Sequence, residues 1–221
     1  MKDRLIVALD VPSLKEARRF VCLLKEKVSL FKVGLELFTA VGPDVVRMIH
    51  DEGGRVFLDL KFHDIPNTVA RACEAADRLG VFMMNLHACG GQEMLKAAES
   101  ADRKFLLLGV TVLTSDRNLP GTSDEVVRLA KECRRAGLSG VVCSAREAKA
   151  VRKACGPRFL IVTPGIRPSG ASRDDQKRVV TPSQAIREGA DYIVVGRPIL
   201  SAADPLQMAS SIVKEIASPP N

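Results

Sequence analysis

Three charged residues at close spacing stand out in the third apolar segment of the chain: Asp59, Lys61 and Asp64. In a strand, residues two apart share a face, so Asp59 and Lys61 are expected to point in the same direction. A buried strand normally excludes charge, because an unpaired buried ion costs several kcal/mol. The spacing therefore predicts an acid, a base and a second acid at a polar site where this strand ends. On charge pattern alone, a structural ion pair explains these residues as well as catalysis does.

The elements that would position these residues alternate along the chain. Short apolar segments rich in β-formers predict eight strands, at residues 5–9, 30–33, 56–60, 82–86, 105–112, 140–143, 159–162 and 192–195. Amphipathic stretches between them predict helices at 14–27, 44–52, 68–79, 91–100, 124–136, 145–154, 182–188 and 205–216. Ser13, Thr122, Ser144, Thr181 and Asp204 are typical N-cap residues for five of these helices.

Eight strand-then-helix units with short connections indicate a parallel sheet, because parallel neighbours need crossover connections. The simplest closed solution is an α/β fold of TIM-barrel type, a single (β/α)8 domain spanning residues 1–221. Barrels of this type commonly form one domain at roughly 200 to 250 residues. A doubly wound open sheet is the alternative, but its glycine-rich G-x-G-x-x-G turn does not follow the first strand.

Composition limits the classes of partner. The chain is 46% hydrophobic, and no apolar run approaches the roughly 20 residues that span a membrane. The first ten residues have too short an apolar run for a signal peptide. Six scattered cysteines without C-x-x-C spacing predict reduced thiols and a cytoplasmic location.

The net charge of +7 raises the question of nucleic-acid binding. Lys and Arg are spread over many segments, Trp is absent and there is one Tyr, so we expect no nucleic acid and no membrane partner. An anionic small molecule fits this charge better, and a merely basic surface also explains it. None of the three histidines has a partner at metal-ligand spacing, so no metal site is expected.

A barrel places its active site at the C-terminal ends of the strands. Polar residues gather at these predicted ends: Asp10, Lys32, Asp59, Lys61, Asp64, Asn85, His87, Thr111, Thr114, Thr163, Arg167 and Arg197. Asp10 could instead accept hydrogen bonds as a helix cap. The accumulation predicts the position of the site, although any barrel shows some of it.

The loops after strands seven and eight commonly form a phosphate site in such barrels. Gly196 allows backbone N–H groups to approach a ligand closely, and Arg197 offers a bidentate guanidinium. Residues 168–176 are small, polar and turn-rich, as in a mobile lid, although composition alone favours a plain surface loop.

In chain order, the fragments LD at 9–10, FKVG at 31–34, DLKFHDIPNT at 59–68, VTVLTS at 110–115, TPGIR at 163–167 and VGRP at 195–198 form a specific pattern. Together they resemble the orotidine 5′-phosphate decarboxylase family over essentially the whole chain. The resemblance implies decarboxylation of orotidine 5′-monophosphate to uridine 5′-monophosphate, the last step of de novo pyrimidine synthesis. It also implies a homodimer that needs neither a metal nor an organic cofactor.

The resemblance further implies roles for individual residues. Lys61 would protonate the carbon that loses carbon dioxide, with Lys32, Asp59 and Asp64 completing a network of alternating charge around the substrate. Asp64, Ile65 and Thr68 would reach into the partner subunit's site, and Asp10 and Lys32 would contact the ribose. Thr114 would contact the pyrimidine, and the phosphate side of the ligand would be held by Arg167, Gln176, Gly196 and Arg197.

Two other functions are compatible with the same residues. A metal-dependent relative, such as a 3-keto-gulonate 6-phosphate decarboxylase or a hexulose phosphate synthase, shares the D-x-K-x-x-D core and uses Mg²⁺. It would need a further acid at the end of the second strand; Glu36 lies nearby, but the pattern of the nucleotide decarboxylase also carries an acid there. The segment 168–176 and Thr114 favour the nucleotide decarboxylase. A non-catalytic barrel that binds a phosphate ligand would leave the Asp59, Lys61 and Asp64 arrangement without a purpose.

Overall fold

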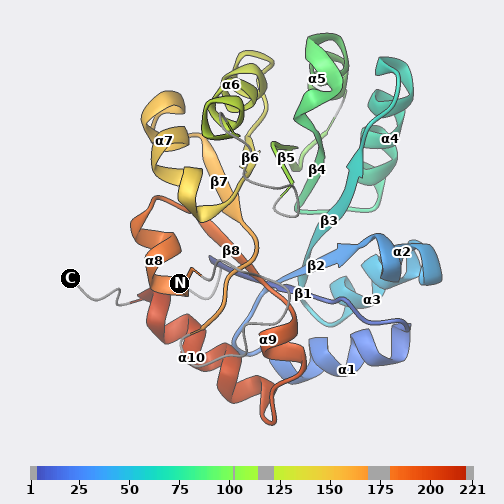
Figure 1. Ribbon diagram of the computed structural model, residues 1–221. Helices are drawn as coiled ribbons and strands as arrows, with labels where there is room; N and C mark the ends of the chain where they lie inside the picture. The colour runs from blue at the N-terminus through green and yellow to red at the C-terminus, as the bar shows by residue number, and fades with distance from the viewer. Residues whose placement is uncertain (1–3, 102, 114–121, 169–179, 218–221) are drawn as a thin grey trace.

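The strands of the protein close into a parallel barrel in which neighbours follow one another in chain order. The computed structural model describes residues 4–101, 103–113, 122–168 and 180–217. Figure 1 shows the strands at the centre and the helices around them. The strands are β1 (Leu5–Ala8), β2 (Leu30–Gly34), β3 (Arg55–Phe62), β4 (Met83–His87), β5 (Leu106–Val110), β6 (Gly140–Val142), β7 (Leu160–Thr163) and β8 (Tyr192–Val195). The predicted (β/α)8 TIM barrel is confirmed.

Each of the eight predicted helices corresponds to a helix of the structure. These are α1 (Leu14–Leu24), α3 (Asp44–Asp51), α4 (Pro66–Arg78), α5 (Gly91–Ser100), α6 (Thr122–Arg135), α7 (Ala145–Cys155), α8 (Pro182–Arg187) and α10 (Pro205–Ala217). Side chains of Ser13, Ser144, Thr181 and Asp204 cap their helices as predicted. Helix α6 is described from Thr122 onward, next to residues outside the described ranges, so the cap at Thr122 stays a prediction.

Three short elements were missed: α2 (Leu35–Val41), α9 (Arg197–Leu200) and the 3₁₀ turn η2 (Ala88–Gly90). None of the three has a side-chain N-cap hydrogen bond. Each also follows its strand almost directly, so neither a cap residue nor a long amphipathic repeat marks it in the sequence.

Side chains alternate between the two faces of each strand. One set fills the barrel interior and consists of Ile6, Ala8, Leu30, Phe57, Met83, Leu108, Val162 and Val194. The intervening residues pack against the surrounding helices in a larger cluster. Every second side chain of a strand points to the same face. Residues two positions after the interior set, at the C-terminal ends of the strands, therefore also face inward.

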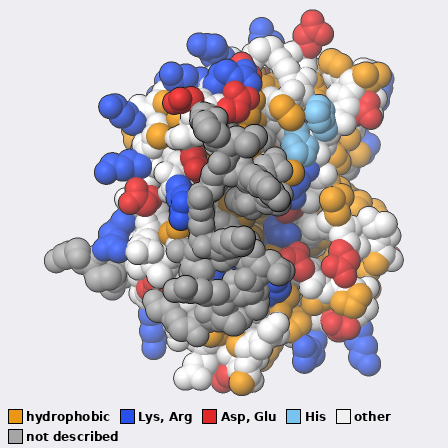
Figure 2. Space-filling model, viewed as in Figure 1, with side chains coloured by type: hydrophobic (Ala, Val, Ile, Leu, Met, Phe, Trp, Pro, Cys, Tyr) orange, Lys and Arg blue, Asp and Glu red, His pale blue; other side chains and the backbone are white. Residues whose placement is uncertain are grey.

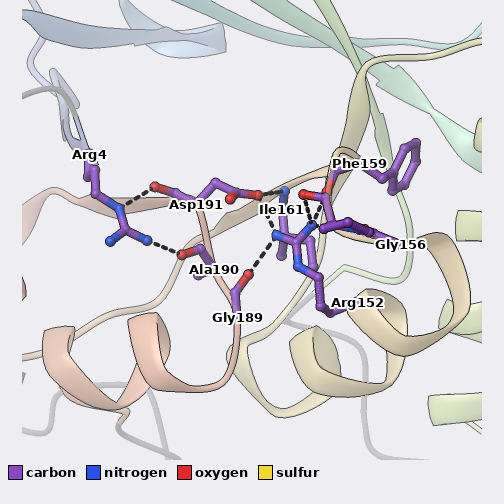
Figure 3. Close-up of polar contacts among 9 residues, drawn as sticks. Arg4, Arg152, Gly156, Phe159, Ile161, Gly189, Ala190 and Asp191 are labelled. Carbon is purple, nitrogen blue, oxygen red and sulfur yellow. Dashed lines mark hydrogen bonds and ion pairs between the residues drawn. The ribbon is translucent and has the colours of Figure 1, made fainter.

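The N-terminal ends of β7, β8 and β1 are joined by two arginines (Figure 3). Arg4 donates to the carbonyls of Asp191 and Ala190 at 3.0 and 2.7 Å. Arg152 pairs with the Asp191 carboxylate at 2.6 Å, and the same carboxylate oxygen accepts the Ile161 N–H at 2.8 Å. Arg152 also donates to four backbone carbonyls, those of Gly156, Pro157, Phe159 and Gly189. Arg152 thereby ties the segment that connects α7 to β7 to the segment that connects α8 to β8.

All six cysteines are free thiols, as the sequence predicts. Within the described ranges, no helix combines the length and the apolar character needed to cross a membrane.

Candidate active site

Four charged side chains from three adjacent strands form a continuous chain of ion pairs at the C-terminal end of the barrel. The Lys61 Nζ lies 2.6 Å from one oxygen of Asp59, and the Lys32 Nζ lies 3.3 Å from the other. Lys32 also pairs with Asp10 at 3.0 Å. The structure thus brings together four of the predicted site residues. In Figure 2, basic and acidic side chains lie next to one another near the middle of the face, to the right of the grey residues, with histidine side chains above them.

Burial and charge act in opposite directions on the two central groups. Burial alone would lower the pKa of Lys32, but the carboxylates of Asp59 and Asp10 outweigh it and raise that pKa above its ordinary value. Burial alone would raise the pKa of Asp59, but the charges of Lys32 and Lys61 and the hydrogen bonds from Lys61 and Asn85 lower it. Lys32 and Asp59 are therefore both charged at neutral pH.

Asn85 of β4 contacts both Asp59 and Lys61. It is only 1% exposed, and its amide N–H donates to the Asp59 carboxylate at 2.7 Å. Its amide oxygen accepts the backbone N–H of Lys61 at 2.9 Å. Lys61 has a φ of 52°, the one positive φ among the described non-glycine residues. The site therefore includes an unfavourable backbone conformation at the residue with the proposed chemical role.

Two glycines leave space for the charged groups. A Cβ on Gly34 would lie 2.9 Å from the Lys32 Nζ, and a Cβ on Gly196 would lie 3.2 Å from an oxygen of Asp10. Contacts below 3.0 Å force a shift of one partner, so the absence of a side chain at position 34 allows Lys32 to reach both carboxylates.

The side chains of Lys32, Asp59 and Lys61 form one side of a cavity of about 190 Å³. Lys32, Asp59, Lys61 and Asn85 supply its polar surface, and the remaining lining is apolar: Phe57, Val110, Val112, Leu113, Val142, Cys143, Pro164 and Val194. The cavity therefore offers an apolar wall for a planar ring opposite a row of charges.

Asp64, Ile65 and Thr68 lie at the rim and are exposed. The Asp64 carboxylate accepts the N–H of Ile65 at 2.6 Å, and among the described residues no ion pair joins it to Lys61. Ile65 precedes α4 and is 67% exposed, which is unusual for a large hydrophobic side chain. The structure thus leaves Asp64 outside the series of ion pairs in its own barrel.

The predicted phosphate residues follow β7 and β8. Arg167 is buried just after β7, and its backbone N–H donates to the carbonyl of Val180. Gly196 precedes α9, and Arg197 is its exposed first residue. Thr114 and Gln176, together with most of the predicted lid at 168–176, lie outside the described residues.

Other polar residues at the strand ends have structural surroundings. Thr111 is buried and donates its hydroxyl to the Val142 carbonyl, and it does not line the cavity. The side chain of Ser13 caps α1, so Asp10 pairs with Lys32 and does not serve as that cap. The rings of His63 and His87 lie 5.6 Å apart beside the site. In the described part of the chain, no group of three or more His, Cys, Asp or Glu could hold a metal ion.

Three features of the site were not predicted: the bridging contacts of Asn85, the space left by Gly34, and the apolar wall from β6. Sequence analysis singled out Asn85 only as a polar residue at a strand end. Strand parity places Val142 on the inner face two residues after Gly140, so the wall could have been found by extending the alternation.

A closed (β/α)8 barrel with paired lysines and carboxylates beside a cavity at its C-terminal end defines a barrel enzyme that acts on a small molecule. Comparison with known proteins gives a narrower class. Residues 3–212 match the model of the "Orotidine 5'-phosphate decarboxylase / HUMPS family". The chain belongs to this family.

Two relatives named orotidine 5′-phosphate decarboxylase are each 52% identical to the chain. The one from Moorella thermoacetica matches over 97% of this chain and 92% of its own, and the one from Pelobacter propionicus over 98% and 96%. The crystal structure of orotidine 5′-phosphate decarboxylase from Lactobacillus acidophilus is also similar, with a TM-score of 0.83 and 37% identity. That match covers 97% of this chain and 99% of the other.

Proposed function

We propose that the protein decarboxylates orotidine 5′-monophosphate to uridine 5′-monophosphate, the last step of de novo pyrimidine synthesis, in the cytoplasm. The observation that carries the proposal is the Lys61 ammonium, 2.6 Å from Asp59 and facing a cavity whose opposite wall is apolar. The names of the 52% identical relatives support the same substrate. The whole chain, residues 1–221, acts as one barrel domain in this proposal.

The reaction breaks the bond between a ring carbon and the substrate carboxylate. Carbon dioxide leaves, and the electron pair remains on the ring carbon as a carbanion. The Lys61 ammonium stabilises this charge and then donates a proton to the same carbon, after which water restores the proton on Lys61. Every atom is supplied by the substrate, Lys61 and water, so the proposed reaction needs neither a metal nor an organic cofactor.

The rest of the network holds this ammonium in place. Asp59 pairs with Lys61 and with Lys32. In the proposed reaction, Asp59 also lies near the substrate carboxylate. Asp10 and Lys32 are proposed to contact the ribose hydroxyls. Arg167, Gln176, Gly196 and Arg197 are proposed to hold the phosphate, and Thr114 to contact the pyrimidine. Because these charges are oriented before the reaction, they need little reorganisation as the carbanion forms.

We further propose a homodimer in which Asp64, Ile65 and Thr68 complete the partner's site. Two of the three large exposed hydrophobic side chains found in the described residues, Leu35 and Ile65, follow β2 and β3 at the rim. Contact with a second subunit would cover them and bring a carboxylate to Lys61.

The test is the loss of absorbance as orotidine 5′-monophosphate is consumed, with a chelator present. We expect the wild type to turn over and Lys61→Ala to lose about 10²- to 10⁴-fold in kcat. Lys25→Ala is the matched control, because Lys25 also pairs with a carboxylate, that of Glu52 at 3.0 Å, but it is the C-cap residue of α1 and does not line the cavity. Turnover only of a sugar phosphate, and only with Mg²⁺, would contradict the proposal.

Mixing two inactive variants tests the shared site. In a dimer of Lys61→Ala with Asp64→Ala, one of the two sites carries neither substitution. Random mixing should therefore restore about a quarter of wild-type activity, since half of the dimers are mixed and half of their sites are intact. Sites built within single subunits would restore no activity on mixing.

A further inference from the structure

Strand β3 is irregular where the site is built. Its pairing with β4 runs Phe57 to Met83 and Leu58 to Met84, and it resumes at Phe62 opposite Leu86. The chain thus advances four residues on β3, from 58 to 62, against two on β4, from 84 to 86, so β3 carries two extra residues. Such a bulge interrupts the ladder and leaves backbone groups without strand partners.

Lys61 lies within this bulge in a left-handed conformation, with a φ of 52°. That region is unfavourable for a residue with a side chain, because its Cβ crowds the following carbonyl. A conformation of this kind persists only where neighbouring groups fix it. The group that bonds the Lys61 N–H is the side chain of Asn85, at 2.9 Å, in place of a β4 backbone carbonyl.

The same amide also reaches the carboxylate that holds the Lys61 ammonium. The Asn85 N–H donates to the Asp59 Oδ1 at 2.7 Å, and this oxygen is the one that lies 2.6 Å from the Lys61 Nζ. A side-chain amide carries an N–H donor and an oxygen acceptor at a fixed separation. One buried side chain therefore holds both the Lys61 backbone and the Asp59 carboxylate. A carboxylate, a hydroxyl or an apolar group at this position cannot make both contacts in the same way.

We propose that Asn85 is a positioning residue for the decarboxylation, holding the Lys61 backbone in its left-handed conformation and the Asp59 carboxylate in line with the Lys61 ammonium. The inference rests on the proposed function for its effect on turnover, but the contact itself can be tested without substrate. Asn85 acts through Lys61 and Asp59 and is not itself required to touch the reacting atoms.

The first measurement is amide hydrogen exchange at Lys61 in the free protein. In Asn85→Ala the Lys61 N–H loses its partner, so we expect its exchange to become at least about tenfold faster than in the wild type. The control is Thr111→Val, which removes a buried side-chain hydrogen bond at the neighbouring strand end. The Val142 carbonyl still accepts the Thr111 backbone N–H there. Unchanged Lys61 exchange in Asn85→Ala overturns the proposal, whatever substrate the enzyme uses.

The second measurement separates kcat from KM for orotidine 5′-monophosphate. Asn85→Ala should lower kcat about 100-fold, because a misplaced reacting group loses rate while the distant contacts still bind the nucleotide. KM should stay within about threefold of wild type, and Thr111→Val should change neither constant. A wild-type kcat in Asn85→Ala overturns the positioning role, whereas an inactive wild type overturns only the proposed function.

Asn85→Asp supplies a shape-matched variant that keeps the volume of the site. When ionised, its carboxylate faces that of Asp59 at the 2.7 Å contact, and the fraction of molecules in which the two groups share a proton rises as the pH falls. The neutral acid can imitate the amide, so the kcat of Asn85→Asp relative to wild type should rise from pH 8 to pH 6. Four other titratable or charged groups lie near this contact: Lys61, Lys32, His87 and His63. Because the wild type and the variant both contain them, taking the ratio of the two kcat values removes the pH dependence that these groups give to both proteins. A ratio that stays flat with pH contradicts the proposal.

Discussion

Replacing Asp59 by Asn separates the electrostatic role of this residue from its shape. Three donors converge on the two carboxylate oxygens: the ammonium groups of Lys61 and Lys32 and the amide of Asn85. An amide at position 59 places an N–H₂ group against at least one of these donors and removes the charge that both lysines share. The substitution therefore leaves two cations with one remaining carboxylate, that of Asp10.

The expected size of the effect follows from burial. The side chains of Asp59 and Lys32 are 12% and 11% exposed, so screening by water is weak. Breaking a buried pair costs about 3 to 5 kcal/mol, and the lower end applies because Lys32 keeps Asp10. For a chain of this length, about 3 kcal/mol lowers the Tm by about 6 to 12 °C. Loss of the preorganised charge should lower kcat by about 10²- to 10³-fold.

The stability difference should depend on pH with a defined sign. The folded-state pKa of Asp59 is lowered because Lys32 and Lys61 outweigh its burial. A group of this kind stabilises the fold above its unfolded pKa, and the contribution is lost as the pH falls through its folded value. The Tm difference between wild type and Asp59→Asn is thus complete at pH 6 to 7 and shrinks only below about pH 4.

The assay pairs calorimetry with turnover of orotidine 5′-monophosphate, and Asp191→Asn is the control. Asp191 also accepts from a cation and a second donor, Arg152 at 2.6 Å and the Ile161 N–H, but at the opposite end of the barrel (Figure 3). We expect Asp191→Asn to cost about 1 to 3 kcal/mol and to leave kcat within about twofold of wild type. The reasoning is refuted if Asp59→Asn keeps the kcat of the wild type. It is also refuted if Asp191→Asn lowers kcat as much as Asp59→Asn does.

Three further predictions concern single positions. Gly34→Ala should fold with a Tm within a few degrees of wild type, because the new methyl meets only the flexible end of Lys32, yet kcat should fall about tenfold as Lys32 is displaced. Arg152→Lys should lower the Tm by roughly 4 to 8 °C in calorimetry with kcat unchanged, since an ammonium cannot reproduce the guanidinium contacts to four carbonyls and Asp191. Glu36→Gln should keep its kcat with and without Mg²⁺, because Glu36 is an exposed residue of α2. A loss of Mg²⁺-dependent activity there would favour a metal-dependent relative.

Periodicity alone predicted most of the framework that carries the site. Alternation along the strands places Asp10, Lys32, Asp59 and Lys61 on the inner face of one end of a closed barrel, and the structure brings these four together. The prediction succeeded because parity and strand order are properties of the sequence, and closure of the sheet then fixes which strands are neighbours.

The bulge in β3 could not be predicted in the same way. Nothing in the local sequence favours a left-handed lysine, since Lys61 lacks the conformational freedom of glycine and the short polar side chain of Asn or Asp. The conformation depends on Asn85, which is 24 residues further along the chain and reaches Lys61 only after β3 and β4 pair. Thr111 shows the related error for strand ends: its polarity suggested the site, but its hydroxyl bonds to Val142.

The two halves of the barrel contribute different kinds of side chain to the cavity. The charged side chains and Asn85 come from strands β1 to β4 and the residues that directly follow them. Strands β5 to β8 and the segments after them contribute mainly apolar groups, including Val110, Val142, Pro164 and Val194. A ring held against the apolar half excludes water from the side where charge develops, which strengthens the attraction between a carbanion and the Lys61 ammonium. The same ammonium in open water would interact far more weakly. The apolar wall therefore supports the proposed reaction by excluding water, although Val110, Val142, Pro164 and Val194 carry no group that could accept or donate a proton.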